Sequence, residues 1–340
     1  MIINMSGAGA PGKVVTVHVP PEAGATVTCT DGKKTVSAVT DSSCNAVFKL
    51  SKGAWTVTAA KSGVSKTANV NVTDNCTLEL SLNQIPAFTY TGEYAIVDDS
   101  YNQIDSTLGN WKIRFLTSGV LTFTALNGAE SGIDVFLVGG GGSGANGCEQ
   151  SDGTRRLARG GGGGYTNTVR GVRISTNTDY SITVGAGGAS ASAISQSGHN
   201  GGSTSAFGAT ANGGKGAVGF TGSSPTGSGG NGGSGGGGAS GNGGSDGADG
   251  SGGDYGTGQK TTTREFGEAG GNLYSGGGGG AVNGAGGAGG GGGGCPTASG
   301  SNGVDGTANT GGGGGAGSRL TSSTHSGAGG SGIVIIRNKR

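Results

Sequence analysis

The stretch SGGGGGAVNGAGGAGGGGGG, residues 275–294, raises the question that decides the fold of this chain. Fourteen of its twenty residues are glycine, which loses about 0.5–1 kcal/mol more backbone freedom on ordering than alanine does. Such a composition brings almost no side chains to a core and is typical of a flexible linker. The alternative is an ordered structure in which the backbones themselves pack together.

Glycine is concentrated in one part of the chain. Residues 1–138 hold 12 of the 85 glycines, and residues 139–340 hold the other 73. The formal net charge of +1 gives no electrostatic reason to expect a nucleic-acid partner. No apolar run approaches the ~18 residues of a membrane helix, and the first residues lack the features of a secretory signal. We therefore expect no nucleic acid, no membrane insertion and no signal peptide.

Residues 12–84 have an ordinary composition and a pattern of short strands. Apolar and polar residues alternate with a period of two, and turn signals such as Asp31-Gly32 separate the runs. We predict strands at residues 14–19, 25–29, 46–50, 55–59, 68–72 and 77–82. The pattern favours a small antiparallel β-sandwich, with Trp55 in its core.

This segment resembles the PEGA-like and other immunoglobulin-like modules of bacterial and phage surfaces. The resemblance rests on Gly24–Val27 with Thr30-Asp31-Gly32, and on Lys52–Val57 followed by Lys61-Ser62-Gly63. It implies an immunoglobulin-like β-sandwich over residues 12–84 that acts as a spacer or a weak binder.

Apolar strands bracket the glycine-rich block, residues 139–331. We predict strands at residues 94–97, 111–115, 119–123 and 133–138 before it, at 165–170 and 180–184 within it, and at 332–337 after it. The run Ile133–Val138 is almost continuously apolar, as expected of a central strand covered on both faces. Because a disordered tail would not need a strand after it, the block is predicted to be an insertion in a β-domain over residues 85–340. The whole chain is thus predicted to be all-β.

Polyglycine II helices would order the glycines. This left-handed helix has three residues per turn and no internal hydrogen bonds, so its N–H and C=O groups point outward and need partners in neighbouring helices. Larger residues should then recur at a spacing of three on edges that face solvent, as Ser228, Asn231 and Ser234 do. Collagen is excluded because its composition requires about 15–20% proline or hydroxyproline, whereas this chain has six prolines.

Residues 87–340 resemble the glycine-rich domains of phage and prophage tail proteins. The resemblance rests on Gly132–Gly142, on Gly160–Gly164 with Tyr165, on Gly311–Gly315, and on Ser331–Arg337. In adhesins at the tips of long tail fibres, similar glycine runs form a bundle of polyglycine II helices, and loops at one end of the bundle bind the host receptor.

The resemblance implies a phage or prophage tail fibre protein that binds a glycan or protein receptor on a bacterial surface. Its location would be the virion tail, with residues 1–11 joining it to other tail proteins. Homotrimers are common among tail fibres, whereas polyglycine II tips can be monomeric, and we favour an oligomer. Two alternatives remain open at this point: a purely structural tail spacer or decoration protein, and a bacterial cell-surface adhesin.

The sequence offers little support for catalysis. The three histidines lie in separate segments, and none belongs to a nucleophile or zinc motif. The five cysteines show no CxxC spacing, so we expect no metal site; free thiols are favoured, with a Cys29–Cys44 bridge as the alternative. We predict no enzyme activity and no cofactor.

The candidate receptor-binding residues lie in the interruptions between glycine runs. If the runs are helices, these interruptions are their connecting loops, and exposed aromatic and arginine side chains on loops are typical of recognition sites. The candidates are Arg155, Arg156, Tyr255, Tyr274 and His325. An equally weighted alternative for each is a structural role at the end of the bundle.

Overall fold

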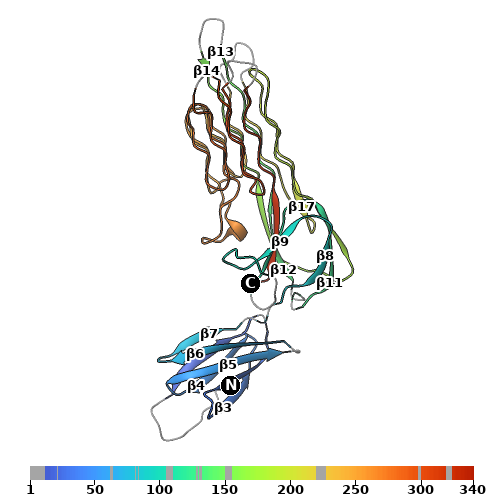
Figure 1. Ribbon diagram of the computed structural model, residues 1–340, viewed down its shortest axis with the longest axis vertical. Helices are drawn as coiled ribbons and strands as arrows, with labels where there is room; N and C mark the ends of the chain where they lie inside the picture. The colour runs from blue at the N-terminus through green and yellow to red at the C-terminus, as the bar shows by residue number, and fades with distance from the viewer. Residues whose placement is uncertain are drawn as a thin grey trace.

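The computed structural model describes residues 12–20, 22–61, 64–80, 82, 84–104, 110–127, 129, 132–149, 155–219, 227–297, 300–318 and 324–340. For residues 64, 148, 149, 155 and 156 it describes the backbone only. The chain is elongated, with a β-module at one end, a second group of sheets in the middle, and the glycine-rich segments extending from it (Figure 1). The described residues form strands and one short 3-10 helix and contain no α-helix, so the all-β prediction is confirmed.

The N-terminal module consists of two sheets. One has the strand order β4-β1-β7 and the other β3-β2-β5-β6. The strands are β1 (Lys13–His18), β2 (Thr26–Thr30), β3 (Thr35–Val39), β4 (Asn45–Leu50), β5 (Gly53–Lys61), β6 (Val64–Val72) and β7 (Cys76–Glu79). All pairs are antiparallel except β1 with β7, which is parallel. The six predicted strands are present; β3 was not predicted.

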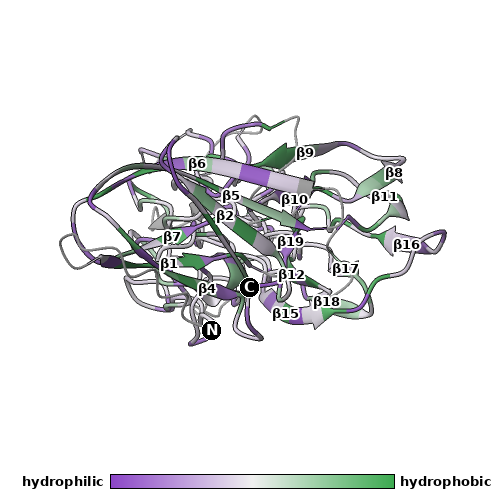
Figure 2. Ribbon diagram, turned by 90° about the horizontal axis from the view of Figure 1, so that it is seen from below, coloured by the Kyte–Doolittle hydropathy of each residue, from purple (hydrophilic) through white to green (hydrophobic). Residues whose placement is uncertain are grey.

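A single side-chain core holds this module together. Alternate residues of both sheets point inward, and Val15, Phe48, Trp55 and Val57 are almost completely buried in one cluster. Figure 2 shows hydrophobic residues alternating with polar ones along these strands. The buried position of Trp55 agrees with the prediction.

Two further sheets form the middle of the molecule. The five-stranded sheet has the order β15-β12-β19-β10-β9, and the three-stranded sheet has the order β16-β11-β8. Their strands are β8 (Ala87–Tyr90), β9 (Tyr94–Val97), β10 (Lys112–Phe115), β11 (Gly119–Ala125), β12 (Ile133–Val138), β15 (Thr166–Val172), β16 (Asp179–Ile182) and β19 (Ile333–Asn338).

Strands β12 and β19 join the two ends of the glycine-rich block. They pair antiparallel over their full length, from Ile133 opposite Asn338 to Val138 opposite Ile333. Both strands are buried on both faces. One face packs in a core with β10, β11 and β16, and the other contacts Phe266 and Tyr274, which explains the nearly continuous apolar sequence of β12.

The glycine-rich part follows directly from β12, and its hydrogen bonds have a period of three. Along residues 139–146, the first of every three N–H groups donates to segment 159–165, the second to segment 196–202, and the third to segment 327–330, at 2.8–3.1 Å. A β-strand would instead direct its N–H groups alternately to two sides. Each turn of this backbone therefore contacts three acceptor segments.

The carbonyls of the same segment bond to other neighbours. They accept hydrogen bonds from Gly188, from residues 214–217 and from residues 314–317. The segment is thus surrounded by hydrogen-bonded backbone, and its glycines are buried. A Cβ added at Gly141, Gly142 or Gly161 would lie less than 3.0 Å from a neighbouring carbonyl. Only glycine permits this approach.

At the outer surface of the glycine-rich part, some backbone N–H groups donate to side-chain oxygens instead of to the carbonyls of a neighbouring segment. Asn231 Oδ1 accepts from the N–H of Thr257 at 2.7 Å, Asn242 Oδ1 from Ala285 at 2.9 Å, and Asp305 Oδ1 from Ala328 at 2.7 Å. The spacing-three prediction was correct in placing Asn231 at the surface and wrong for Ser234, which is buried. Ser234 Oγ accepts from the N–H of Gly247, so a serine also fits inside the packed segments.

Shorter elements interrupt the glycine segments. The hairpin β13 (Cys148–Glu149) and β14 (Arg155–Arg156) lies at the end far from the sheets (Figure 1). A second hairpin, β17 (Thr204–Ala206) and β18 (Ala209–Ala211), and the 3-10 helix η2 (Glu265–Gly267) lie at the sheet end. The predicted strands at 165–170 and 180–184 correspond to β15 and β16.

Candidate functional site

The glycine-rich part has a distal end, which we define as residues 146–147, 193–197, 218–219, 227–228, 301 and 317–318. These residues are distant in sequence but hydrogen-bonded to each other: Gly147 donates to Gly317, Ser195 to Gly147, Val218 to Ser228, and Ser318 to Ser301. The β13–β14 hairpin follows directly (Figure 1). The backbone packing therefore gathers several chain reversals on one surface, away from the sheets.

A layer of small side chains supports the distal end. Ala145, Ala158, Ala217, Ala281, Cys295 and Ala316 form one buried cluster, with Leu157 packed against it. At this level the segments leave room for a methyl or thiol group, whereas the glycines beside β12 do not. The distal end thus rests on a packed apolar layer.

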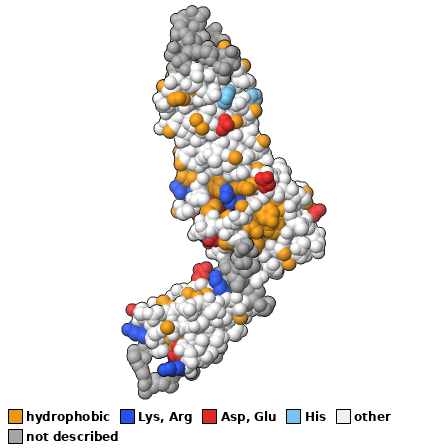
Figure 3. Space-filling model, viewed as in Figure 1, with side chains coloured by type: hydrophobic (Ala, Val, Ile, Leu, Met, Phe, Trp, Pro, Cys, Tyr) orange, Lys and Arg blue, Asp and Glu red, His pale blue; other side chains and the backbone are white. Residues whose placement is uncertain are grey.

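Two exposed apolar side chains mark the distal end. Ile194 is 57% exposed and Val218 is 45% exposed. Their turns are in contact, because a Cβ added at Gly219 would meet the Ser195 carbonyl. Figure 3 shows a mostly white surface with scattered hydrophobic and few charged side chains on the visible face of the glycine-rich part. Sequence reasoning missed these two residues, although isolated apolar residues in a glycine–serine context were a usable signal.

Three of the five predicted site residues lie at or beside the distal end. Arg155 and Arg156 pair with Glu149 and Cys148 in the β13–β14 hairpin, and their side chains lie outside the described residues. His325 is half-buried, its N–H donates to Asn302, and its carbonyl lies against Gly317. Residues 220–226, which also interrupt the glycine runs, lie outside the described part.

Tyr255 and Tyr274 lie elsewhere. Tyr255 is 48% exposed on the flank, next to Asp254, which forms an ion pair with Arg159 at 3.0 Å. Tyr274 is only 4% exposed, and its ring packs at the sheet end against Phe136, with a centroid separation of 5.4 Å. The structure thus places Tyr274 in the core, because residues 259–274 return from the glycine-rich part to cover the sheet.

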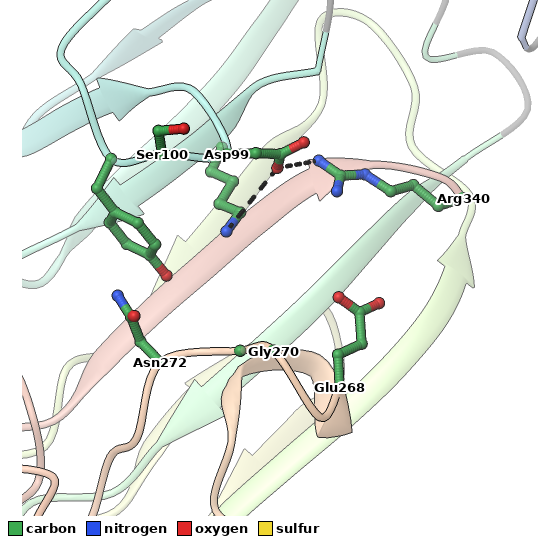
Figure 4. Close-up of a pocket in the computed structure, with 9 residues that line it drawn as sticks. Asp99, Ser100, Glu268, Gly270, Asn272 and Arg340 are labelled. Carbon is green, nitrogen blue, oxygen red and sulfur yellow. Dashed lines mark hydrogen bonds and ion pairs between the residues drawn. The ribbon is translucent and has the colours of Figure 1, made fainter. Parts of the chain in front are cut away.

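A cavity of about 520 Å³ lies where this return meets the sheet. It is lined by Asp99, Ser100, Tyr101, Lys112, Glu268, Gly270, Gly271, Asn272 and Arg340 (Figure 4). Arg340 pairs with Asp99 at 2.6 Å on one wall, and Glu268 and Asn272 lie on the opposite side. The Lys112 ammonium lies 4.4 Å from the centre of the Tyr101 ring.

Buried ion pairs lie beneath this cavity. Arg337, fully buried on β19, bonds to Asp134 and Glu268 and stacks on Phe266. Lys112 lies 2.8 Å from the Glu265 carboxylate. Burial raises the pKa of Glu265 to about 7 and lowers the pKa of Lys112, whereas the hydrogen bond from Arg337 lowers the pKa of Glu268. These charges connect the glycine-rich part to the sheet.

Other features of the described residues add no site. Within the described ranges, no three metal-ligating side chains come together. No helix there has the length and apolar character to cross a bilayer. The described thiols Cys29, Cys44, Cys76 and Cys295 are unbridged, so the Cys29–Cys44 alternative does not form.

The segment from β11 to the end of β19 matches a known family. The model of the glycine-rich domain family matches residues 116–339, about two thirds of the chain. The chain belongs to the glycine-rich domain family. The match begins before the glycines and includes β12 and β19, so this glycine-rich domain includes the strands that hold both of its ends. A search of curated proteins found no match.

Proposed function

We propose that this glycine-rich domain protein is a phage or prophage tail fibre protein that attaches to a bacterial surface through its distal end. Its glycine segments would be polyglycine II helices packed as a bundle. The three-residue hydrogen-bond period along residues 139–146 supports this, since polyglycine II has three residues per turn. The N-terminal module would be an immunoglobulin-like spacer.

One observation carries the proposal: several turns of the glycine-rich part meet at one surface, far from the sheets. A rigid backbone scaffold can hold variable loops without depending on their sequence, which suits receptor recognition. Ile194 and Val218 provide apolar contact area there, and Arg155, Arg156 and His325 lie nearby. Tyr255 is retained as a secondary contact on the flank, and Tyr274 is not.

The partners follow from this assignment. The receptor would be a surface glycan or protein, and residues 1–11, outside the described residues, would join other tail proteins. The assembled protein would be part of the virion tail, with a homotrimer as the expected oligomer. No enzymatic step and no cofactor are proposed.

The test is cell binding by matched variants. Labelled full-length protein is sedimented with a panel of bacterial strains, and binding strains are then tested with Ile194→Asp and Val304→Asp. Val304 is also 57% exposed but lies on the flank, where it bonds to Gly293 and Gly315. We expect at least tenfold weaker binding for Ile194→Asp and little change for Val304→Asp. Equal binding by all three proteins would place the receptor contact outside the distal end, and binding to none of the strains would favour a structural spacer.

A further inference from the structure

Lys112 and Glu265 form a buried contact between two segments that are far apart in the sequence. Lys112 lies on β10 in the five-stranded sheet, and Glu265 begins η2 in the segment that returns from the glycine-rich part to cover that sheet. Their side chains are 9% and 1% exposed, and Lys112 Nζ is 2.8 Å from Glu265 Oε1. The fold therefore holds an amine against a carboxyl group, away from bulk water.

The contact is close, but it is not a well-formed ion pair. It lacks the angles of a hydrogen bond, and Glu265 Oε1 has no hydrogen-bond partner among the described residues. The nearest other carboxylate, Asp99, is 3.9 Å from Lys112 Nζ, which is beyond hydrogen-bond distance. Burying two charges is costly unless the geometry is good and the remaining polar atoms are hydrogen-bonded. An ion pair alone therefore leaves this buried oxygen unexplained.

Burial favours the uncharged forms of both groups. It raises the pKa of Glu265 to about 7 and lowers the pKa of Lys112, because an apolar environment disfavours charge. One proton that moves from Nζ to the carboxyl group converts the pair to these forms. They are also the reactive forms, since a neutral amine has a free lone pair and a protonated carboxyl group can release water.

We propose that Lys112 and Glu265 form an intramolecular amide bond that joins the returning segment covalently to the sheet. The lone pair of Nζ attacks Glu265 Cδ, so that the C–N bond forms and a C=O electron pair moves to Oε2. A second proton then passes from the nitrogen to Oε1. The Cδ–Oε1 bond breaks, Oε1 leaves as water, and the C=O bond to Oε2 forms again. Nothing is oxidised or reduced, and no co-reactant is consumed.

The surroundings of the pair suit this condensation. The Tyr274 hydroxyl donates to Glu265 Oε2 at 3.5 Å, so it can stabilise the negative charge that develops on that oxygen. Lys112 also lines the cavity shown in Figure 4, where Asp99 and Glu268 are exposed to solvent, which gives the released water a way out. Holding the two groups together favours the bond, because well-oriented intramolecular groups reach effective concentrations of about 10⁵–10⁸ M.

The exposed pair of Lys260 and Asp249 provides an internal comparison. It brings together the same two functional groups, but the Lys260 side chain is 61% exposed. The hydrogen bond from Lys260 lowers the pKa of Asp249 and keeps the carboxylate charged. A charged carboxylate in water does not accept an amine, so we expect no amide bond at this pair.

The bond has a structural consequence that does not depend on the proposed attachment function. It would fix the returning segment, residues 259–274, to the sheet at a point where the glycine-rich part has few side chains to hold it. Glu265 titrates as a free carboxyl group only until the bond forms, so its pH-dependent contribution to stability belongs to freshly folded, unbonded chains.

The test is mass spectrometry of the full-length protein after incubation at neutral pH. We expect the intact mass to fall below the mass of the sequence by one water molecule. We also expect a branched tryptic peptide that joins residues 67–114 to residues 265–319, with no cleavage after Lys112. Dehydration at an Asp-Gly step would lower the mass without making a branched peptide. Absence of the branched peptide after prolonged incubation would leave an ion pair only and overturn the proposal.

Three variants assign the bond to this pair. Lys112→Arg keeps the positive charge but removes the amine, so the branched peptide should be lost, whereas Lys260→Arg should form it as the unmodified protein does. Tyr274→Phe removes the hydroxyl beside Oε2 and should slow formation of the branched peptide at least tenfold in a time course after refolding. Equal rates in Tyr274→Phe and the unmodified protein would overturn the role of this hydroxyl, and a persisting water loss with a branched peptide in Lys112→Arg would overturn the assignment to Lys112.

Discussion

The N-terminal module and the glycine-rich part bury their backbones in opposite ways. In the module, side chains such as Phe48 and Trp55 fill the space between two sheets. In the glycine-rich part, backbone segments approach so closely that a single Cβ has no room at Gly142 or Gly161. One region excludes water with side chains, the other with the backbone itself. Stability in the second region therefore depends on hydrogen bonds rather than on apolar area.

The largest effect should come from truncating a core side chain of the module. Phe48→Ala removes an almost fully buried ring and should lower the free energy of unfolding of the module by about 3–5 kcal/mol. Denaturant unfolding followed by Trp55 fluorescence would measure this. Trp111 belongs to the core of the middle sheets, so the unfolding transition reported by Trp111 fluorescence should not shift. A shift of both transitions would mean that the module and the middle sheets unfold together.

Adding one methyl group to a packed glycine should destabilise the glycine-rich part almost as much as Phe48→Ala destabilises the module. Gly161 donates to Gly314 and accepts from Gly278, and a Cβ there would collide with the Gly142 carbonyl. We expect Gly161→Ala to cost about 3 kcal/mol, the upper part of the usual range for overpacking. Hydrogen exchange of residues 139–147 should accelerate strongly.

Gly270→Ala is the matched control for that substitution. A Cβ at Gly270 would meet nothing within 4 Å, and its backbone angle suits other residues. The free energy of unfolding of the Gly270→Ala variant should change by less than about 0.5 kcal/mol. Equal hydrogen exchange in both variants would contradict close backbone packing as the source of order.

Buried Glu265, where the glycine-rich part meets the five-stranded sheet, should make stability depend on pH. Burial raises the pKa of Glu265 from 4.5 to about 7, so the folded state binds this proton more tightly than the unfolded state. The resulting stability is complete below pH about 4.5, falls as the pH rises to about 7, and is absent above it, a loss of roughly 2–3 kcal/mol. Thermal unfolding at pH 5 and pH 8 would measure the difference.

Glu265→Gln isolates this effect. The amide cannot titrate, so the variant should lose most of the change between pH 5 and pH 8. The carboxyl groups whose pKa is lowered, such as Glu268, are ionised throughout this range and should not contribute. An unchanged pH dependence in Glu265→Gln would assign the effect to another group.

The smallest effect should come from the side chains that close the outer surface of the glycine-rich part. Asn242→Ala removes the acceptor of the Ala285 N–H and should cost about 1 kcal/mol, because the exposed N–H can bond to water instead. Asn212→Ala is the comparison, since the Asn212 side chain makes no hydrogen bond to the described residues. Stability that is equal in the two variants would mean that water replaces these oxygens at no cost.

Much of the strand pattern could be predicted from sequence, because alternation with a period of two reflects one buried and one exposed face. Ile133–Val138 and Ile333–Arg337 were recognisable because burial on both faces requires a continuous apolar run. Strand β3 was missed because TVSAV is short, has only two valines among small and polar residues, and lies at a sheet edge. The spacing-three rule succeeded for Asn231 and failed for Ser234, because spacing reflects the three-residue period of the backbone but not which of its sides has a neighbouring segment.

For the candidate site, the sequence located interruptions but not their positions in space. Tyr255 and Tyr274 occur in similar contexts, yet one is exposed on the flank and the other packs on Phe136. Ile194 and Val304 are equally exposed, but only Ile194 lies at the distal end.

The sequence by itself determined that this protein has two kinds of core, because glycine content fixes how closely backbones can approach and alternation fixes which side chains can be buried. The tertiary structure alone decided which segments are neighbours. A glycine backbone offers the same N–H and C=O groups at every position, so its pairing carries no sequence code. The strands β12 and β19 set where the segments begin and end, and this decides which residues reach the distal end.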